Sequence, residues 1–309
     1  MSLIKIQKIF SDIPSCEAWS LQLLQIKTSR KKGTTYIGRE IQLSPKGTLQ
    51  ALVSEIAERY GEEKKGILCS YTDVRPYDGS AIANVIYKLE ADNELIQAEY
   101  AAFIKAIASP DRESDPLEFK TQAYLLKGIV TSGGEEHRIK LISLQNPVTT
   151  LKHKYYQAAG TFKKMSDKVI TLRTSMDVLI CDNTVYMLTL SGEKLFHMER
   201  AYRMICSHQM DEIEKCGMVE GFEAFRSIAE SGHNPRKFVS FDNNYFQKLK
   251  NVGCRRRMAH MFGIPLVGDR FALSEPKSAE KWIKLLCRQG MIDPFENCPM
   301  EVVGSKKWG

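Results

Sequence analysis

The sequence predicts an α+β protein. We expect a domain with a mixed or antiparallel sheet and flanking helices, followed by a basic, winged-helix-like C-terminal module. Apolar and β-branched runs bounded by turn residues predict the strands, and apolar residues at i, i+3, i+4 spacing between them predict the helices. A length of 309 residues is natural for two domains. The turn at 232–235 (Gly-His-Asn-Pro) divides the chain into domains at 1–232 and 233–309.

The first half of the chain alternates strands and helices. Residues 15–27 predict a strand or a short helix, and a basic turn at 29–33 separates them from a strand at 34–41. A helix begins at Ser44-Pro45 and ends at Gly61. Further strands are expected at 66–71 and 85–89, on either side of a turn at 75–80, and a helix at 92–108.

Two hairpins form the centre of the predicted sheet. Strands at 122–131 and 137–144 flank the turn Ser132-Gly133-Gly134. A β-rich stretch at 169–172 leads into strands at 178–181 and 184–188, joined by Asp182-Asn183, residue types that tolerate a positive φ. We expect this second hairpin to be core, with the following side chains buried and in contact with no ligand: Val178, Ile180, Val185 and Met187.

Helices dominate the rest of the chain. Helical spacing covers 193–216 and 219–231. The C-terminal segment reads as helices at 243–251, 254–262 and 277–289, with short strands at 266–273 and 300–308. Short helices combined with small strands are what favours a winged-helix-like module.

Composition excludes several classes of protein. No window approaches the roughly 18 consecutive apolar residues of a membrane span, and lysines interrupt the N-terminal stretch where a signal peptide would need an apolar core. The eight cysteines include no CxxC pair, so we expect reduced thiols in a cytoplasmic protein. Cys206, His208 and Cys216 lack the paired spacing of a zinc site, and no metal or cofactor is expected.

The net charge of +7 is confined to one segment. Residues 1–150 carry 19 Lys and Arg against 19 Asp and Glu, and residues 151–230 carry 11 against 11. Residues 231–309 carry 14 against 7, so the entire excess lies in the last quarter of the chain. Segregated positive charge indicates a partner with phosphates or an acidic surface.

Six cations in this quarter are candidate nucleic-acid contacts: Arg255, Arg256, Arg257, Lys281, Lys284 and Arg288. Consecutive arginines fan around a helix, so at least one must face solvent. The other three are spaced i, i+3, i+7 and share a helical face opposite the apolar Trp282, Leu285 and Leu286. Such a face suits phosphate contacts, which are salt-dependent and indifferent to sequence. A solvated helix face explains the same pattern.

A second candidate is the run at 151–165, where four lysines accompany three aromatic residues: Lys152, Lys154, Lys163 and Lys164 with Tyr155, Tyr156 and Phe162. Bases stack on aromatic rings and phosphates attract lysines. The alternative is the solvated basic edge of a hairpin.

No strong catalytic constellation is present. Asp115, Glu118 and Lys120 match the loose pattern of two carboxylates and a lysine found in magnesium-dependent nucleases. Charged loops match that pattern often. The sequence has no GxxxxGKS loop, no GxSxG elbow and no HExxH motif, and we assign no catalytic residue.

Residues 67–225 resemble the large domain of the B component of the Kiwa antiphage system, a bacterial family of formerly unknown function. The resemblance rests on the order of apolar elements: the strand at 66–71 with the helix after it, the strands within 122–144, and the stretch from Phe162-Lys163-Lys164 through Asp177–Ile180 to Thr184–Met187. The helix start at Lys194–Met198 completes it. It covers about half of the chain and contains no invariant catalytic string.

The resemblance implies a cytoplasmic effector that binds phage double-stranded DNA and blocks its replication or expression. It also implies a membrane-embedded partner subunit, which would recruit the chain to the inner membrane. We expect self-association into a homodimer or higher oligomer. Two other hypotheses stay open: a magnesium-dependent nuclease, and a scaffold that docks on its membrane partner through the basic face.

Overall fold

The computed structural model describes residues 1–16, 18–29, 33–61, 65–111, 120–144, 155–158, 160–164, 172–292 and 298–302. The chain forms two compact units. Unit 1 consists of Met1–Pro76 and Asn84–His197, and unit 2 consists of Tyr77–Ala83 and Met198–Gly309. The chain therefore passes between the units after Pro76, after Ala83 and after His197. The domain boundary expected at residue 232 stays a prediction, and it falls inside unit 2.

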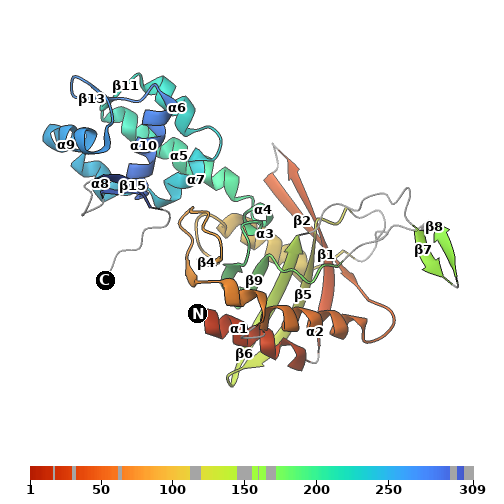
Figure 1. Cartoon of the computed structure of the whole chain (residues 1–309). Coiled ribbons are helices and arrows are strands. Elements are labelled where there is room, and N and C mark those ends of the chain that lie inside the picture. The colour runs from red at the N-terminus through yellow and green to blue at the C-terminus, as the bar shows by residue number, and fades with distance from the viewer. Residues whose placement is uncertain are drawn as a thin grey trace. The chain divides into compact units, whose positions relative to one another are not determined.

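Unit 1 is built on an eight-stranded sheet with the order β2-β1-β5-β6-β9-β10-β4-β3 (Figure 1). Neighbouring strands pair antiparallel, except β3 and β4, which are parallel. The mixed sheet with flanking helices that the sequence predicts is therefore confirmed. The strands are β1 (Ser20–Ser29), β2 (Gly33–Ile41), β3 (Asp73–Pro76), β4 (Val85–Glu90), β5 (Ala123–Ser132), β6 (Glu135–Leu144), β9 (Val178–Cys181) and β10 (Thr184–Met187).

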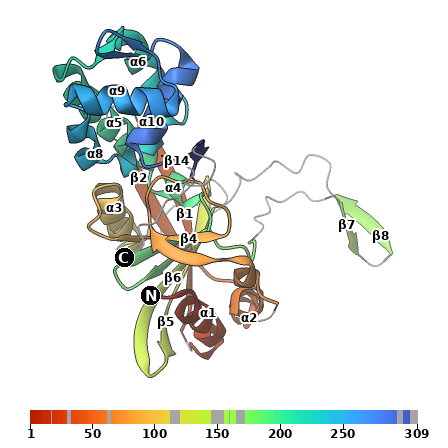
Figure 2. The ribbon, with the colours of Figure 1, turned by 60° about the vertical axis from the view of Figure 1, so that its left-hand side comes forward.

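Helices cover both faces of this sheet. Figures 1 and 2 show α1 (Leu3–Asp12) and α2 (Thr48–Gly61) side by side on one face, where they share a core with Leu21 and Leu23 of β1. The intervening residue Gln22 points to the opposite face, because side chains alternate along a strand. There its Nε2 donates to the carbonyl of Ile107 in α3 (Gln97–Ala108) at 3.2 Å.

The hairpin β9–β10 lies inside the sheet, paired with β6 on one side and β4 on the other. Asp182 adopts a φ of 54° in its turn. The four side chains expected in the core are all fully buried: Val178, Ile180, Val185 and Met187. The predicted burial of these side chains is confirmed. Residues 169–171 of the predicted β-rich stretch lie outside the described residues.

The prediction of a strand at 66–71 is wrong. Residues Ile67–Ser70 form a 3₁₀ helix, η2, in which only Leu68 is buried. The next residue, Tyr71, donates its hydroxyl to the carbonyl of Leu188 at 2.6 Å. Backbone hydrogen bonds from Cys69 to Gly66 and from Tyr71 to Leu68 close this short helix. An apolar run of this length cannot be assigned from its composition alone.

Unit 2 is a helical unit with a core around Trp282, which contacts the rings of Phe225 and Phe271. The predicted helices are confirmed, with small shifts at their ends. They are α5 (Met198–Lys215), α6 (Phe222–Ala229), α8 (Asn243–Lys248), α9 (Val252–Phe262) and α10 (Pro276–Leu286). The first residues of the helix predicted at 193–216 belong instead to a separate short helix of unit 1, α4 (Gly192–Leu195). The short helix α7 (Asn234–Lys237) was not predicted, because its first residues were assigned to the turn at 232–235.

Short strands accompany these helices. β12 (Leu266–Val267) and β13 (Arg270–Ala272) form a hairpin between α9 and α10, and β13 also pairs in parallel with β11 (Val219–Glu220). The hairpin is thus part of a three-stranded sheet and not a free wing. The described residues of unit 2 do not show the winged-helix-like module that the sequence led us to expect. β14 (Gly290–Ile292) pairs with β15 (Pro299–Glu301).

Two further observations complete the fold. β7 (Tyr155–Ala158) and β8 (Thr161–Lys164) form a separate two-stranded sheet. None of the helices among the described residues is long and apolar enough to cross a membrane.

Candidate functional site

The arginine cluster is presented by α9. Asn251 caps the start of this helix by accepting a hydrogen bond from the Cys254 amide at 3.1 Å, and Gly263, with a φ of 60°, ends it. Between these caps the three arginines point in different directions, as a period of 3.6 residues requires.

Two of the three arginines are tied to one aspartate. Arg255 is half-buried and donates from Nη1 to the carbonyl oxygen of Asp269 at 2.9 Å. Arg256 donates from Nε to the Asp269 carboxylate at 2.7 Å. Arg257 is exposed, and no described residue forms a hydrogen bond or ion pair with its guanidinium. The expectation that at least one arginine faces solvent is confirmed, because Arg256 and Arg257 are both exposed.

The cations of α10 do not share one face as predicted. Lys281 and Lys284 lie on the helix, and Trp282, Leu285 and Leu286 are buried beneath it. Arg288 lies beyond the last helical residue, Leu286, with a φ of 56°. Its Nε donates to Asp242 at 2.7 Å. The prediction of an i, i+3, i+7 face was wrong for Arg288, because the chain leaves the helix before reaching it.

Lys281 contacts the C-terminal end of α9. Its Nζ lies 3.5 Å from the carbonyl oxygen of Phe262, at the C-terminal end of α9. The carbonyls at that end of a helix carry partial negative charge, so a cation is favourable there. Lys281 therefore joins α10 to α9, and its remaining donors face solvent.

The lysine–aromatic run is only partly described. Lys163 and Lys164 lie in β8. Lys152 and Lys154 lie outside the described residues. Asp115 and Glu118 of the nuclease hypothesis also lie outside them, whereas Lys120 is described and exposed. The nuclease hypothesis therefore stays a prediction.

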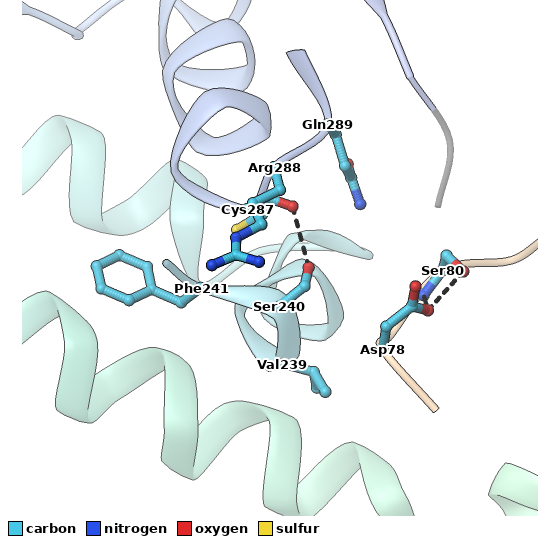
Figure 3. Close-up of a pocket in the computed structure, with 8 residues that line it drawn as sticks. All are labelled: Asp78, Ser80, Val239, Ser240, Phe241, Cys287, Arg288 and Gln289. Carbon is cyan, nitrogen blue, oxygen red and sulfur yellow. Dashed lines mark hydrogen bonds between the residues drawn. The ribbon is translucent and has the colours of Figure 1, made fainter. Parts of the chain in front are cut away.

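A pocket of 290 Å³ opens in unit 2 beside Arg288 (Figure 3). Its walls come from three segments: the insertion Tyr77–Ala83, the residues before α8, and the residues after α10. The side chains of Asp78, Ser240 and Arg288 bring polar groups to it, and Phe241 and Val239 supply apolar wall. Ser240 donates its hydroxyl to the carbonyl of Cys287 at 3.1 Å.

The insertion that forms one wall of this pocket is held firmly. Arg236 donates from Nε to the hydroxyl of Tyr77 and from Nη2 to the carbonyl of Ser80, both at 2.9 Å. The Tyr77 and Tyr202 hydroxyls lie 2.5 Å apart.

The pocket is also lined by Cys287. Burial raises the pKa of the Cys287 thiol, so this thiol is neutral near pH 7 and unsuited to act as a nucleophile.

A second polar pocket, of 450 Å³, lies in unit 1. Arg173, Lys194 and His197 line it together with hydroxyls and the Asp177 carboxylate. His197 adopts a φ of 46°, a costly conformation for this residue, and its Nε2 lies 3.3 Å from the Thr28 hydroxyl. Asp177 accepts from the Leu144 amide at 2.8 Å and from the Thr189 hydroxyl at 2.6 Å. Sequence reasoning missed this pocket, because its residues come from distant segments with no shared motif.

Comparison with known proteins finds a family to which part of the chain is similar. The family model described as "Kiwa protein KwaB-like" matches residues 137–289. No curated protein and no solved structure matches the chain. The matched region begins in β6, includes the β9–β10 hairpin and all of α5–α10, and so draws on both units.

Proposed function

We propose, because residues 137–289 belong to the Kiwa KwaB-like family, that this chain binds double-stranded DNA without sequence preference. Membership of this family makes the chain a component of a Kiwa antiphage defence system. In this proposal the chain is the effector of that system, and binding to phage DNA blocks its replication or expression.

The single observation that carries DNA binding is the set of solvent-facing cations on the helices of unit 2. Arg257 on α9 and Lys277 on α10 are exposed. Phosphate oxygens are acceptors that suit both side chains.

Arg256 and Lys281 lie on the same two helices, but each already forms a contact within the protein. Arg256 is 66% exposed although it pairs with Asp269. Lys281 reaches the end of α9 with one donor. In this proposal Arg256 and Lys281 attract nearby phosphates by their charge. Arg255 and Arg288 instead stabilise the structure of unit 2 through their hydrogen bonds.

Binding to a labelled DNA duplex across a salt series tests the proposal. Affinity should fall steeply between about 50 mM and about 200 mM salt, because neutralising phosphates releases counterions. The double variant Arg257→Glu/Lys277→Glu should bind more weakly and lower the salt slope by about 0.9 for each phosphate that is no longer neutralised. An affinity that does not change with salt contradicts the proposal.

A matched control has the same change in charge away from unit 2. Lys46 and Lys105 are exposed residues of unit 1, and Lys46→Glu/Lys105→Glu should retain the wild-type salt slope. Equal weakening in both double variants would show that net charge, and not the α9–α10 surface, governs binding. Repeating the titration with Mg²⁺ and with EDTA separates binding from cleavage of the duplex.

The family membership also suggests a partner subunit. We propose that the chain works beside a membrane-embedded subunit of the Kiwa system and that it self-associates. Co-purification with that subunit in detergent, and light scattering of the isolated chain, test the two points separately. Recovery of the chain alone contradicts the first, and a monomeric mass contradicts the second.

A further inference from the structure

Three potential metal ligands meet at one end of the unit 1 sheet. Cys181 is the last residue of β9, and Asp182 follows it in the turn to β10. His137 comes from β6, the neighbouring strand. Ile139 is the register partner of Cys181, so His137 lies two residues further along, beside the β9–β10 turn. Strand pairing thus brings together residues that are far apart in the sequence.

The ligand atoms are close enough to share one ion. His137 Nδ1 lies 3.0 Å from Asp182 Oδ2. Cys181 Sγ lies 3.7 Å from the same oxygen. The three ligand atoms all lie within 4.8 Å of one another. Around a tetrahedral zinc ion, bond lengths of about 2.0 to 2.3 Å place such atoms roughly 3.4 to 3.6 Å apart. Small side-chain rotations would supply that spacing.

A carboxylate stands on the far side of the histidine ring. Glu135 Oε2 lies 3.9 Å from His137 Nε2. Metal-bound histidines commonly donate their second ring N–H to a carboxylate, which fixes the ring and makes the bound nitrogen more basic. Glu135 has the position for this role once Nδ1 is taken by the metal.

Burial is graded across the cluster. Asp182 is 53% exposed, His137 is 13% exposed and Cys181 is buried. An ion can therefore enter past the exposed carboxylate and reach the buried thiol. A bound cation favours the thiolate form of Cys181, which is the form that binds a metal.

We propose that His137 Nδ1, Cys181 Sγ and Asp182 Oδ2 bind one Zn²⁺ ion, with water as the fourth ligand. Sulfur, nitrogen and oxygen ligands at tetrahedral spacing are what zinc accepts. On binding, the thiol proton passes to solvent as the sulfur–zinc bond forms. The ring proton of neutral His137 moves by way of solvent from Nδ1, where it is donated to Asp182, to Nε2 on the side of Glu135. Two bonds to the metal then replace the His137–Asp182 hydrogen bond. The ion joins β6 to the β9–β10 turn.

Titration with Co²⁺ tests the proposal, because cobalt occupies zinc sites and has visible absorption. The full chain should bind one Co²⁺ with d–d bands of a tetrahedral site and a thiolate-to-cobalt charge-transfer band, and Zn²⁺ should abolish both. Cys181→Ser should lose the charge-transfer band, and His137→Gln should bind at least about tenfold more weakly. Absence of the bands, or their persistence in Cys181→Ser, overturns the proposal.

A matched cysteine variant and a folding check keep the result clear. Cys69 is exposed and lies outside the cluster, so Cys69→Ser should retain the full spectrum. If Cys69→Ser loses the charge-transfer band, the cobalt is bound elsewhere and the proposal fails. Circular dichroism confirms that the variants fold. For Cys181→Val, which fills a buried position without a ligand atom, Zn²⁺ should give no rise in Tm, whereas the wild type should gain several degrees. A gain in Cys181→Val equal to that of the wild type also overturns the proposal.

Discussion

Arg288 and Asp242 join the end of α10 to the start of α8. The guanidinium Nε donates to Asp242 Oδ2 at 2.7 Å, while Oδ1 accepts from the amides of Asn244 and Tyr245 at 3.0 and 3.2 Å. One carboxylate therefore caps a helix and pairs with a cation at once. This arrangement makes Arg288 part of the framework of unit 2 and not a free phosphate ligand.

The Asp242 cap should make the free energy of unfolding depend on pH in the acidic range. Its hydrogen bond from Arg288 lowers the pKa of the carboxyl below its ordinary value, so its contribution is present above about pH 4 and is lost as pH falls through the lowered pKa. Urea unfolding should show a steeper loss of stability below about pH 4 for the wild type than for Asp242→Asn. An equal acid dependence in the two proteins would contradict this assignment.

Substitution of Arg255 should lower the stability of the protein, whereas substitution of Arg257 should lower its affinity for DNA. Arg255→Ala removes the donor to the Asp269 carbonyl and should cost about 1–3 kcal/mol of unfolding free energy. Arg257→Ala, on the exposed side of the same helix, should change stability by no more than about 0.5 kcal/mol. Chemical denaturation measures both, and anisotropy with labelled DNA should show the loss of affinity in Arg257→Ala. Equal destabilisation by the two variants would argue against this division.

Gly79 should tolerate no side chain. It adopts a φ of 77°, and an added Cβ would lie 2.3 Å from the carbonyl oxygen of Arg236. Gly79→Ala should therefore destabilise unit 2 by more than the roughly 1–2 kcal/mol of left-handed backbone strain alone. Gly268→Ala is the matched control, because Gly268 has a φ of 60° and nothing within 4 Å of the added Cβ. Thermal unfolding compares the two, and equal destabilisation would show that the backbone around Arg236 relaxes.

The thiols should differ in reactivity. Burial raises the pKa of Cys206 to about 12, whereas Cys69 is exposed. Iodoacetamide at about pH 8 should alkylate Cys69 and leave Cys206 unmodified in the folded protein, because the thiolate is the nucleophile. Peptide mass spectrometry after short exposure measures both, with protein in urea as the fully reactive control. Rapid alkylation of Cys206 without denaturant would indicate that the α5–α6 region opens.

Much of the fold follows from local pattern. The turn Asp182-Asn183 between two apolar runs specifies the β9–β10 hairpin, because Asp182 adopts a φ of 54° and aspartate tolerates a positive φ better than most residues. The α10 stripe of Trp282, Leu285 and Leu286 specifies the buried face of that helix. Where local signals are weak, as in the run at 66–71, one distant contact decides the structure, and sequence reasoning assigned the wrong element.

The candidate sites divide in the same way. Residue type and period are enough to predict where the positive charge accumulates, which helices carry it and which side chains form the core. Contacts between distant segments are needed to show that Asp269 binds Arg255 and Arg256 while Arg257 faces solvent, and that the chain leaves α10 before Arg288. The tertiary structure alone places His137 beside Cys181 and Asp182. Each of these depends on strand register and on contacts between distant segments, which no local period encodes.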